Sequence, residues 1–275
     1  MATSTSIGSA PVNGIDIHYD AAGAGFPLVL LHAGICDRRM WDEQMPALAD
    51  HFRVIRYDQR GFGQTPMPLG PFAHLADLEG LLLALGIERA HLLGCSRGGS
   101  LALDFALAHP ERVGGLVLVC SSPSGYQPPQ PVPESAQVPD LIAAFDAGNL
   151  ERAAELEVQV WVDGPRRTPD QVSPAMRARV YEMDLQAMRI EAASQGQEHE
   201  RKPERPGAAR LAEVRAPTLV IIGDQDAPIS LSSGEALAAG IPGARRMVMA
   251  GTAHLPNMEQ PALFNGMVVD FLRAL

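Results

Sequence analysis

The sequence has no long hydrophobic run and no strong basic cluster, and each absence excludes a class of function. No segment provides the roughly 18 consecutive apolar residues of a membrane-spanning helix, so no membrane association is expected. Residues 1–6 contain neither a basic segment nor an apolar core, so no secretory signal is expected. Basic residues gather only at 201–205, where an acid interrupts them, and the net charge is −10. Because phosphate binding requires a clustered basic surface, nucleic acid is not an expected partner.

The sequence is also poor in cysteine, and its three cysteines cannot all pair with one another. Cys36, Cys95 and Cys120 each lie in or beside an apolar run. This placement predicts buried free thiols and a cytoplasmic protein, because the cytoplasm is reducing. No pair of Cys or His residues has the spacing of metal ligands, so no metal site is expected.

The chain does contain enough apolar material for a large core, with 275 residues of which 46% are hydrophobic. Short apolar segments recur along most of the chain and alternate with helical patterns. The segments that predict strands are residues 15–19, 26–32, 52–58, 90–94, 113–121, 218–223 and 246–250. Strand–helix alternation is typical of an α/β fold, in which helices cover both faces of a largely parallel sheet.

One region, residues 123–207, interrupts the alternation. It begins with a proline-rich segment, which excludes a helix or a central strand there. Three helical patterns without a strand signal follow, at residues 136–147, 150–162 and 169–193. We expect this region to form a helical cap over the carboxyl edge of the sheet, where open α/β sheets bind ligands. The core domain is then expected to consist of residues 1–122 and 208–275.

The strongest functional signal is the stretch HLLGCSRGG at residues 91–99. An apolar strand runs into Gly-x-Ser-x-Gly, and the helical pattern of residues 100–108 follows. A serine on such a sharp strand-to-helix turn has a strained backbone and presents its hydroxyl above the sheet. Gly94 and Gly98 are expected to be necessary, because side chains there would collide with the neighbouring strand or helix. Ser96 is therefore the predicted nucleophile.

A serine hydroxyl is a weak nucleophile, so it requires a general base that is oriented by an acid. The chain has eight histidines, and His254 is the predicted base. It follows the strand at 246–250, in a loop at the carboxyl edge of the sheet and on the same side as Ser96. We expect His74 and His199 to lie in helical or linker segments away from this edge.

The acid is expected to follow the strand at 218–223, where Asp224 and Asp226 are both candidates. The chain order Ser, Asp, His is that of the α/β hydrolases, and the sequence resembles this family over essentially its whole length. The resemblance implies a mostly parallel sheet of eight strands with the cap inserted after the sixth. It also implies that the acid is Asp226, three residues after the glycine that ends the strand, and that Asp224 is a turn residue.

The resemblance further implies an oxyanion hole made of two backbone N–H groups. One belongs to Arg97, directly after the nucleophile, and the other to Gly34 in the loop that begins at His32. Family members usually carry His-Gly-x in this loop, whereas Ala33 replaces the first glycine here, so Ile35 remains an alternative donor. His32 is expected to hydrogen-bond within the loop and not to act as a second base.

A second segment, YDQRGFGQ at residues 57–64, resembles the family signature Asp-x-Arg-Gly-x-Gly. The resemblance implies a structured turn beside the active site, in which Asp58 and Arg60 tie loops together.

Serine at the elbow predicts acyl transfer and not the epoxide or halide chemistry of relatives with aspartate there. The leading hypothesis is a carboxylic-ester hydrolase or lactonase that needs no cofactor. By resemblance, the pattern at residues 35–42 is closest to esterases and 3-oxoadipate enol-lactonases. Cleavage of C–C bonds in dienoic ring-cleavage products, perhydrolysis and hydroxynitrile-lyase chemistry remain open with the same three residues. A hydrolase-like receptor that binds a small molecule with little turnover also remains open.

The cap is expected to select the substrate, a small molecule. The large apolar residues expected at the pocket are Ile35, Phe145, Trp161, Met183, Met188 and Leu255. For the cap residues among them, packing of the cap against the core is the competing interpretation. Because few basic residues are predicted near the site, we do not expect a strongly anionic substrate. The sequence leaves monomer and homodimer open.

Overall fold

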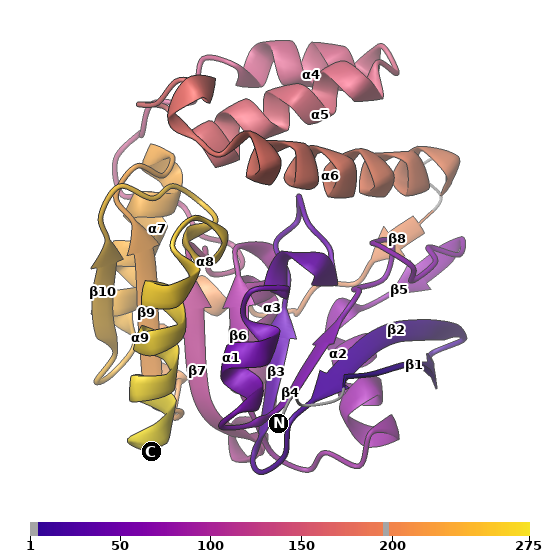
Figure 1. Cartoon of the computed structure of the whole chain (residues 1–275), viewed down its shortest axis with the longest axis vertical. Helices are drawn as coiled ribbons and strands as arrows, with labels where there is room; N and C mark the ends of the chain where they lie inside the picture. The colour runs from indigo at the N-terminus through magenta and orange to yellow at the C-terminus, as the bar shows by residue number, and fades with distance from the viewer. Residues whose placement is uncertain (1–4, 195–197) are drawn as a thin grey trace.

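The computed structural model describes residues 5–194 and 198–275. Its main sheet has eight strands in the order β1-β2-β4-β3-β6-β7-β9-β10 (Figure 1). The strands β1 and β2 run antiparallel to their neighbours and the others are parallel, which confirms the predicted fold class. Their bounds are Ser6–Val12, Ile15–Ala22, Pro27–Leu31, Arg53–Tyr57, Ala90–Cys95, Val113–Val119, Thr218–Gly223 and Arg245–Met249 for β1, β2, β3, β4, β6, β7, β9 and β10.

No strand was predicted at the position of β1, and the structure explains why. This strand is an edge strand that pairs only with β2 in the main sheet. It contains serine, glycine and proline, which are uncommon inside strands, and most of its residues face solvent. Because an edge strand can form with few apolar residues, hydrophobic periodicity did not predict β1.

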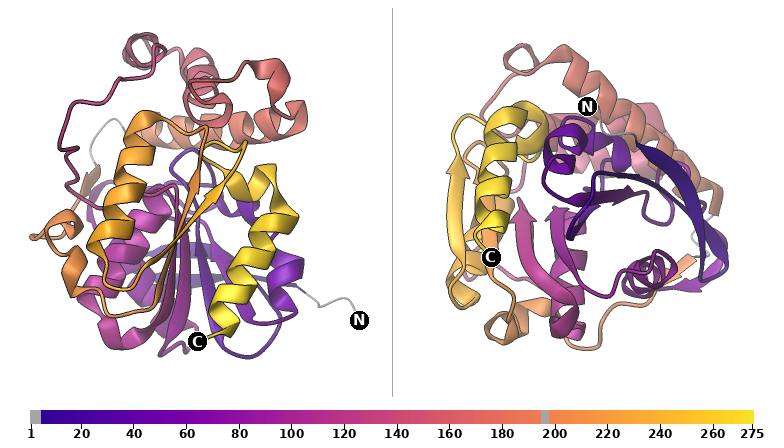
Figure 2. Two further views of the ribbon diagram at one scale, coloured as in Figure 1. Left: turned by 90° about the vertical axis from the view of Figure 1, so that its left-hand side faces the viewer. Right: turned by 60° about the horizontal axis from the view of Figure 1, so that its bottom comes forward.

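Helices cover both faces of the main sheet (Figure 2). Residues of β3 point alternately to the two faces: Leu28 and Leu30 join one cluster of buried apolar side chains, and Val29 and Leu31 join the other. The first cluster includes residues of α1 (Met45–Ala49) and α9 (Pro261–Arg273), and α8 (Pro256–Glu259) contacts α9. The second cluster includes residues of α2 (His74–Ala84), α3 (Arg97–Ala108) and α7 (Pro228–Gly240).

Between β7 and β9 the chain forms the cap helices, which lie across the carboxyl end of the sheet (Figure 1). These are α4 (Val138–Asp146), α5 (Leu150–Glu157), the π-helical segment Val158–Asp163, and α6 (Pro174–Ser194). The strand β7 is the sixth strand of the main sheet in chain order. The third helical pattern is broken near its start, because a short 3-10 turn, Pro169–Gln171, precedes α6. The prolines that begin both segments are tolerated only at a helix start.

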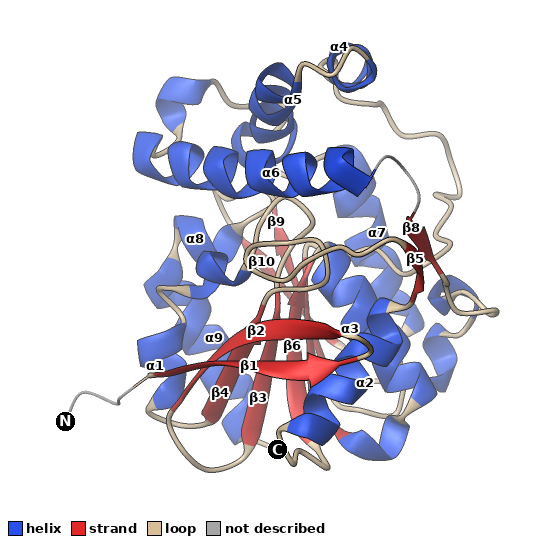
Figure 3. Ribbon diagram, turned by 90° about the vertical axis from the view of Figure 1, so that its right-hand side faces the viewer, coloured by secondary structure: helices blue, strands red, loops and turns tan. Residues whose placement is uncertain are grey.

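A second, two-stranded sheet lies beside the main one (Figure 3). Its strands β5 (Gly70–Phe72) and β8 (Glu198–Glu200) pair in parallel. The sequence predicted no strand between residues 58 and 90 and none between residues 121 and 218, so this pairing corrects both expectations. Each strand has three residues, too few for a periodic signal, and the partner is far away in the sequence. The pairing fixes the chain that returns from the cap against the core.

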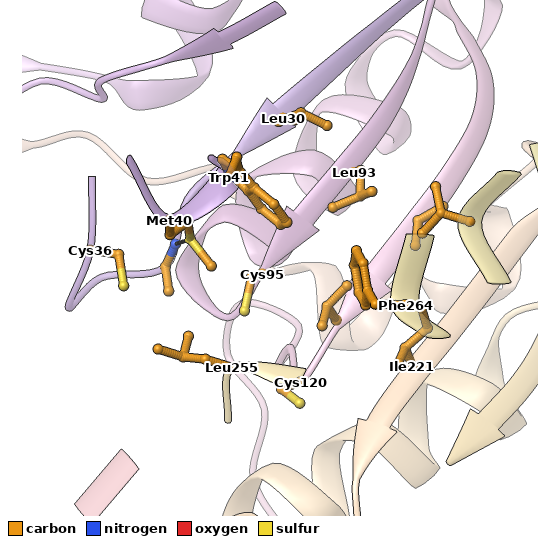
Figure 4. Packing of buried hydrophobic residues seen from close by; sticks show 14 of the residues in the cluster. Leu30, Cys36, Met40, Trp41, Leu93, Cys95, Cys120, Ile221, Leu255 and Phe264 are labelled. Atoms are coloured by element: carbon orange, nitrogen blue, oxygen red, sulfur yellow. Dashed lines mark hydrogen bonds between the residues drawn. The ribbon is translucent and has the colours of Figure 1, made fainter. Parts of the chain in front are cut away.

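The three cysteines are free and buried, as predicted. Cys95 ends β6 directly before the predicted nucleophile, and Figure 4 places it among Leu93, Trp41 and Leu255 in the core. This packing anchors the strand end on which the site is built. Among the residues that the structure describes, no helix combines the length and apolarity needed to span a lipid bilayer.

Candidate active site

Ser96 forms the turn between β6 and α3. Its φ is 52°, a left-handed conformation that non-glycine residues rarely adopt, and its N–H donates to the carbonyl oxygen of Val119 at 2.8 Å. A Cβ on Gly94 would lie 2.3 Å from the carbonyl oxygen of Gly98, and a Cβ on Gly98 would lie 2.2 Å from that of Leu31. The turn therefore requires both glycines, as the sequence predicted.

His254 and Asp226 meet in the loops that follow β10 and β9. Nδ1 of His254 lies 2.8 Å from Oδ2 and 3.1 Å from Oδ1 of Asp226, and the two residues are only 4% and 0% exposed. The other candidate acid, Asp224, instead accepts the N–H of Gly251 at 2.7 Å. The structure thus brings Asp226, and not Asp224, to the histidine. With Nδ1 bound to the carboxylate, Nε2 is the nitrogen left to accept a proton from a nucleophile.

Trp161, in the π-helical segment of the cap, lies against His254. The two ring centroids are 4.6 Å apart, and the N–H of His254 donates to the carbonyl oxygen of Trp161 at 3.3 Å. The cap therefore contributes directly to the position of the imidazole. Short π-helical segments within helices are frequent at functional sites. Here the segment places the side chain of Trp161 against His254 at the sheet edge.

The predicted oxyanion loop lies beside the elbow. Gly34, Ile35 and the side chain of Arg97 line the same cavity as Ser96. Nδ1 of His32 lies 2.8 Å from the carbonyl oxygen of Ala33, and its Nε2 accepts the N–H of Gln59 at 2.9 Å. Burial lowers the pKa of His32, so this ring is neutral and holds the loop, as the sequence predicted.

The segment from Asp58 to Gly63 forms a turn fixed by ion pairs and hydrogen bonds. Asp58 accepts the N–H groups of Arg38 and Gln64 at 2.9 and 2.8 Å and pairs with the Arg38 guanidinium. Arg60 donates to both oxygens of Asp77, at 2.7 and 2.9 Å. These contacts tie loops together, which is the role that the resemblance implied.

Two chambers lie at the elbow and share part of their walls. The cap chamber has a volume of about 640 Å³ and extends under the cap helices. The linker chamber, about 480 Å³, extends toward the linkers at both ends of the cap. The residues that line both chambers are Ser96, Arg97, Trp161, Glu200 and His254. A substrate bound at Ser96 can therefore place one part on each side of the reacting carbonyl.

Comparison with known proteins decides the family. The model of the alpha/beta hydrolase fold family matches residues 27–261. The chain belongs to the α/β-hydrolase fold family. It is 33% identical to the 2-hydroxy-6-oxononadienedioate/2-hydroxy-6-oxononatrienedioate hydrolase of Paraburkholderia xenovorans (strain LB400), over 94% of this chain and 91% of that protein.

A second curated relative is the 2-hydroxy-6-oxo-6-phenylhexa-2,4-dienoate hydrolase of Comamonas testosteroni, 31% identical over 94% of this chain and 91% of that protein. Among solved structures, the enol-lactonase from Burkholderia xenovorans LB400 has a TM-score of 0.75 and 27% identity, covering 96% of this chain and 99% of that one. The α/β-hydrolase resemblance is confirmed, and the chain is a hydrolase. The names of the curated relatives support the alternative left open above, C–C bond hydrolysis, better than ester hydrolysis.

Four of the predicted pocket residues line the cap chamber of this α/β hydrolase: Ile35, Phe145, Trp161 and Met188. Met183 and Leu255 do not line either chamber as far as the chain is described, which corrects those two predictions. Both are fully buried in the core cluster, where Figure 4 places Leu255 near Cys95 and Cys120. Met183 lies outside the chamber because of its position around the helix axis. One face of α6 carries the chamber residues, and Met183 lies on the adjacent face, which packs on the core.

Sequence reasoning also misplaced His74. This residue begins α2 at the edge of the linker chamber, and its Nε2 accepts a hydrogen bond from Nη2 of Arg97 at 2.6 Å. The Arg97 guanidinium also lies 3.9 Å from Glu200 and 5.4 Å from the ring centroid of Phe62. Burial and the adjacent arginine lower the pKa of His74 well below its usual range, so it acts as a neutral acceptor that holds Arg97 beside the nucleophile.

Acidic side chains that the sequence reasoning did not single out also line the cap chamber of this hydrolase. They are Asp146, Glu157, Asp184, Glu191 and Glu200. The sequence does mark two of them, because each is flanked by apolar residues: Glu157 lies between Leu156 and Val158, and Asp184 lies between Met183 and Leu185. An acid inside an apolar stretch of a helix is rarely buried without a specific role.

Cys120, Asp226 and His254 place one potential metal-ligand atom each within 4.8 Å of the others. Burial raises the pKa of the Cys120 thiol well above its usual range, and thiolates, not thiols, are metal ligands. The carboxylate and the imidazole already bind one another. We therefore assign Asp226 and His254 to the predicted triad and not to a metal site.

Proposed function

We propose that this α/β hydrolase cleaves a small or medium carboxylic ester or lactone at Ser96 through an acyl-enzyme intermediate. The proposal depends on the convergence of Ser96 with the hydrogen-bonded pair His254 and Asp226 at one cavity. A serine at a strained elbow beside a buried imidazole–carboxylate pair is the arrangement that activates a hydroxyl for attack on a carbonyl carbon.

In the proposed reaction, Nε2 of His254 takes the proton of Ser96 as the hydroxyl oxygen attacks the carbonyl. Asp226 keeps Nδ1 protonated and stabilises the imidazolium. The backbone N–H groups of Arg97 and of Gly34, with Ile35 as the alternative, hold the oxyanion. Arg97 is the first residue of α3, whose positive helix end favours the developing negative charge. His254 then protonates the leaving alcohol and activates the water that releases the acid.

The charge of the cap chamber supports an ester or lactone over a dicarboxylate. The chamber is lined by the five acids named above, whereas Arg97 is the one basic side chain at its wall within the described residues. The relative's name denotes a dicarboxylate, the nonadienedioate. Placing such a dianion among these acids, of which Asp184 is buried and Glu157 half-buried, would be opposed by charge repulsion and by desolvation.

A second candidate function is hydrolysis of the C–C bond in a 2-hydroxy-6-oxo-dienoate. The observation that favours it is the naming of the curated relatives, which match over nearly the whole chain. The same serine, histidine and aspartate would serve this reaction, so the three residues do not separate the two functions. The substrate does.

The deciding experiment assays one purified preparation against both substrate classes. One set contains 4-nitrophenyl esters of increasing acyl length and simple lactones, and the other contains 2-hydroxy-6-oxo-dienoates with a neutral or an anionic end group. We expect turnover of esters or lactones and much slower cleavage of the dienedioate. Faster cleavage of a dienoate than of every ester and lactone would reject the leading proposal and establish the second.

Ser96→Ala provides the control for the nucleophile, and Ser9→Ala, an exposed serine in β1, is its matched variant. We expect Ser96→Ala to lose at least about 10⁴-fold in kcat, because loss of a triad nucleophile has effects of this size or larger. Ser9→Ala should retain activity. Undiminished turnover in Ser96→Ala would reject both candidate functions.

A further inference from the structure

Two carboxyl groups in the cap chamber take no part in the proposed mechanism. Asp184, on α6, is only 4% exposed. Its Oδ2 and the Oε2 of Glu157, at the end of α5, are buried and have no hydrogen-bond partner within the described residues. Both side chains line the cap chamber. Because buried polar atoms are nearly always hydrogen-bonded, two such atoms on residues that line one chamber point to a ligand.

The two carboxyl groups also lie close enough to repel each other. Burial, followed by the charges of Glu157 and Glu191, raises the pKa of Asp184 to about 8. Burial likewise raises the pKa of Glu157, although a hydrogen bond from Trp161 and the charge of His254 lower it in part. Desolvation and like charges both disfavour the ionised form. A positive charge placed between the groups would relieve both effects.

Within the described part of the chain, no arginine or lysine forms an ion pair with Asp184 or Glu157. The cap and its flanks are rich in arginine, but these side chains pair with acids outside the chamber. The pairs are Arg167 with Glu259, Arg177 with Glu155 and Asp163, Arg179 with Asp42, and Arg189 with Glu151. Arg97 reaches the chamber wall, but its guanidinium is hydrogen-bonded to His74 and lies over the ring of Phe62.

We propose that the cap chamber recognises an organic cation, an ammonium or similar group of the substrate, which binds between Asp184 and Glu157. The inference rests on the proposed hydrolysis of an ester or lactone at Ser96 and names its substrate class. The cationic group belongs to whichever part of the substrate, acyl or alcohol, occupies the cap chamber while the reacting carbonyl lies at Ser96. The apolar walls, including Phe145 and Trp161, suit the carbon chain that carries the charge.

This recognition has a defined pH dependence. A bound cation favours the ionised form of Asp184, so binding releases its proton, and the affinity for a cation rises with pH as this carboxyl ionises. The titratable or charged groups around Asp184 are Glu157 from α5, Glu191 from α6 and Cys36 from the loop after β3, with Asp146, Arg97, Glu200 and His254 along the chamber. Burial raises the pKa of Cys36 well above its usual range, so this thiol remains neutral throughout.

The test uses two matched pairs of substrates in which only the charge differs. The acyl pair is the 4-nitrophenyl ester of 4-(trimethylammonio)butyrate and that of 5,5-dimethylhexanoate. The alcohol pair is acetylcholine and 3,3-dimethylbutyl acetate. Quaternary nitrogen keeps the substrate charge constant with pH, and the ratio of kcat/KM within a pair cancels any pH effect that is common to both substrates.

We expect the cationic member of one pair to be preferred about tenfold at pH 9, the lower end of what a close buried charge pair contributes. The preference should fall toward unity at pH 6. A ratio near one in both pairs at pH 9, or a preference that does not change with pH, overturns the inference. In either case, Ser96-dependent turnover of the neutral esters leaves the proposed function standing.

The variants Asp184→Asn and Glu157→Gln remove the charge without changing the shape. Each should reduce the preference for the cation at pH 9, and the double variant should abolish it. Glu182→Gln is the matched control, because Glu182 lies on the same helix but is exposed and outside the chamber. An equal loss of preference in Glu182→Gln would mean that only the overall charge matters, which also overturns the inference.

Discussion

The loops at the carboxyl edge of the sheet and the cap that covers them differ in whether their buried titratable groups have hydrogen-bond partners. At the sheet edge, Asp226 and His254 bind one another, and both ring nitrogens of His32 have partners. In the cap, Asp184 and Glu157 each have an oxygen without a partner in the described chain. Buried groups that hydrogen-bond one another stabilise one arrangement of the site, whereas buried groups without a partner are available to bind a ligand. We infer that the sheet edge carries the chemistry and that the cap carries selectivity.

The largest effect should come from breaking the satisfied pair at the sheet edge. Asp226→Asn should lower kcat on the esters about 10⁴-fold, because an amide stabilises the wrong histidine tautomer and cannot compensate the imidazolium. Asp224→Asn is the matched variant, two residues away, and should have little effect on kcat. Steady-state kinetics with thermal unfolding of both variants checks this. If the two substitutions lowered kcat equally, Asp226 would not be the triad acid.

Two methionines on α6 should separate the packing of the cap from its selectivity. Met183 is fully buried in the core cluster, so Met183→Ala should lower the free energy of unfolding by about 3 kcal/mol. Met188 lines the cap chamber, so Met188→Ala should shift the preferred acyl chain to a longer one, by up to about tenfold in relative kcat/KM.

Urea unfolding and the ester panel, applied to both variants, test this separation. A shift of acyl preference in Met183→Ala as large as that in Met188→Ala would contradict the placement of Met183 outside the chamber.

The same division between sheet edge and cap explains what could be predicted from the sequence. The elbow could be predicted because its constraints are local: the glycines around Ser96 are required by backbone contacts within a few residues and with the adjacent strand. His254 and the two candidate acids, Asp224 and Asp226, could be predicted because parallel strands end at the same edge, and the family resemblance selected Asp226. The short strands β5 and β8 could not, since three residues each leave no periodic pattern.

In the cap, the sequence predicts that helices exist but not which way each side chain faces. Met183 and Asp184 are adjacent in the chain, yet one packs on the core and the other lines the chamber. A rotation of about 100° per residue separates them, and only the docking of α6 sets its absolute phase. His74 was misplaced for a related reason, because the pairing of β5 with β8 at the start of α2 was not predictable.

The smallest effect should appear in stability and should depend on pH. The pKa of Asp184 is raised to about 8 in the folded protein, whereas an unfolded Asp titrates near 3.9. Between these values the folded state binds one more proton than the unfolded state, so this group lowers stability as pH rises from about 4 to 8. Asp184→Asn removes that penalty. It should therefore be about as stable as the native sequence near pH 4 and more stable at pH 8.

Urea unfolding of Asp184→Asn and of Glu182→Gln at both pH values measures this difference. Glu182 is exposed on the same helix, so its variant should differ from the native sequence by no more than about 0.5 kcal/mol at either pH. A gain in Asp184→Asn that is the same at pH 4 and pH 8 would mean that packing, and not ionisation, is responsible. A gain confined to high pH, accompanied by loss of the cation preference, would mean that the cap of this hydrolase loses stability in exchange for recognition. At the sheet edge, by contrast, Asp226 and His254 satisfy one another.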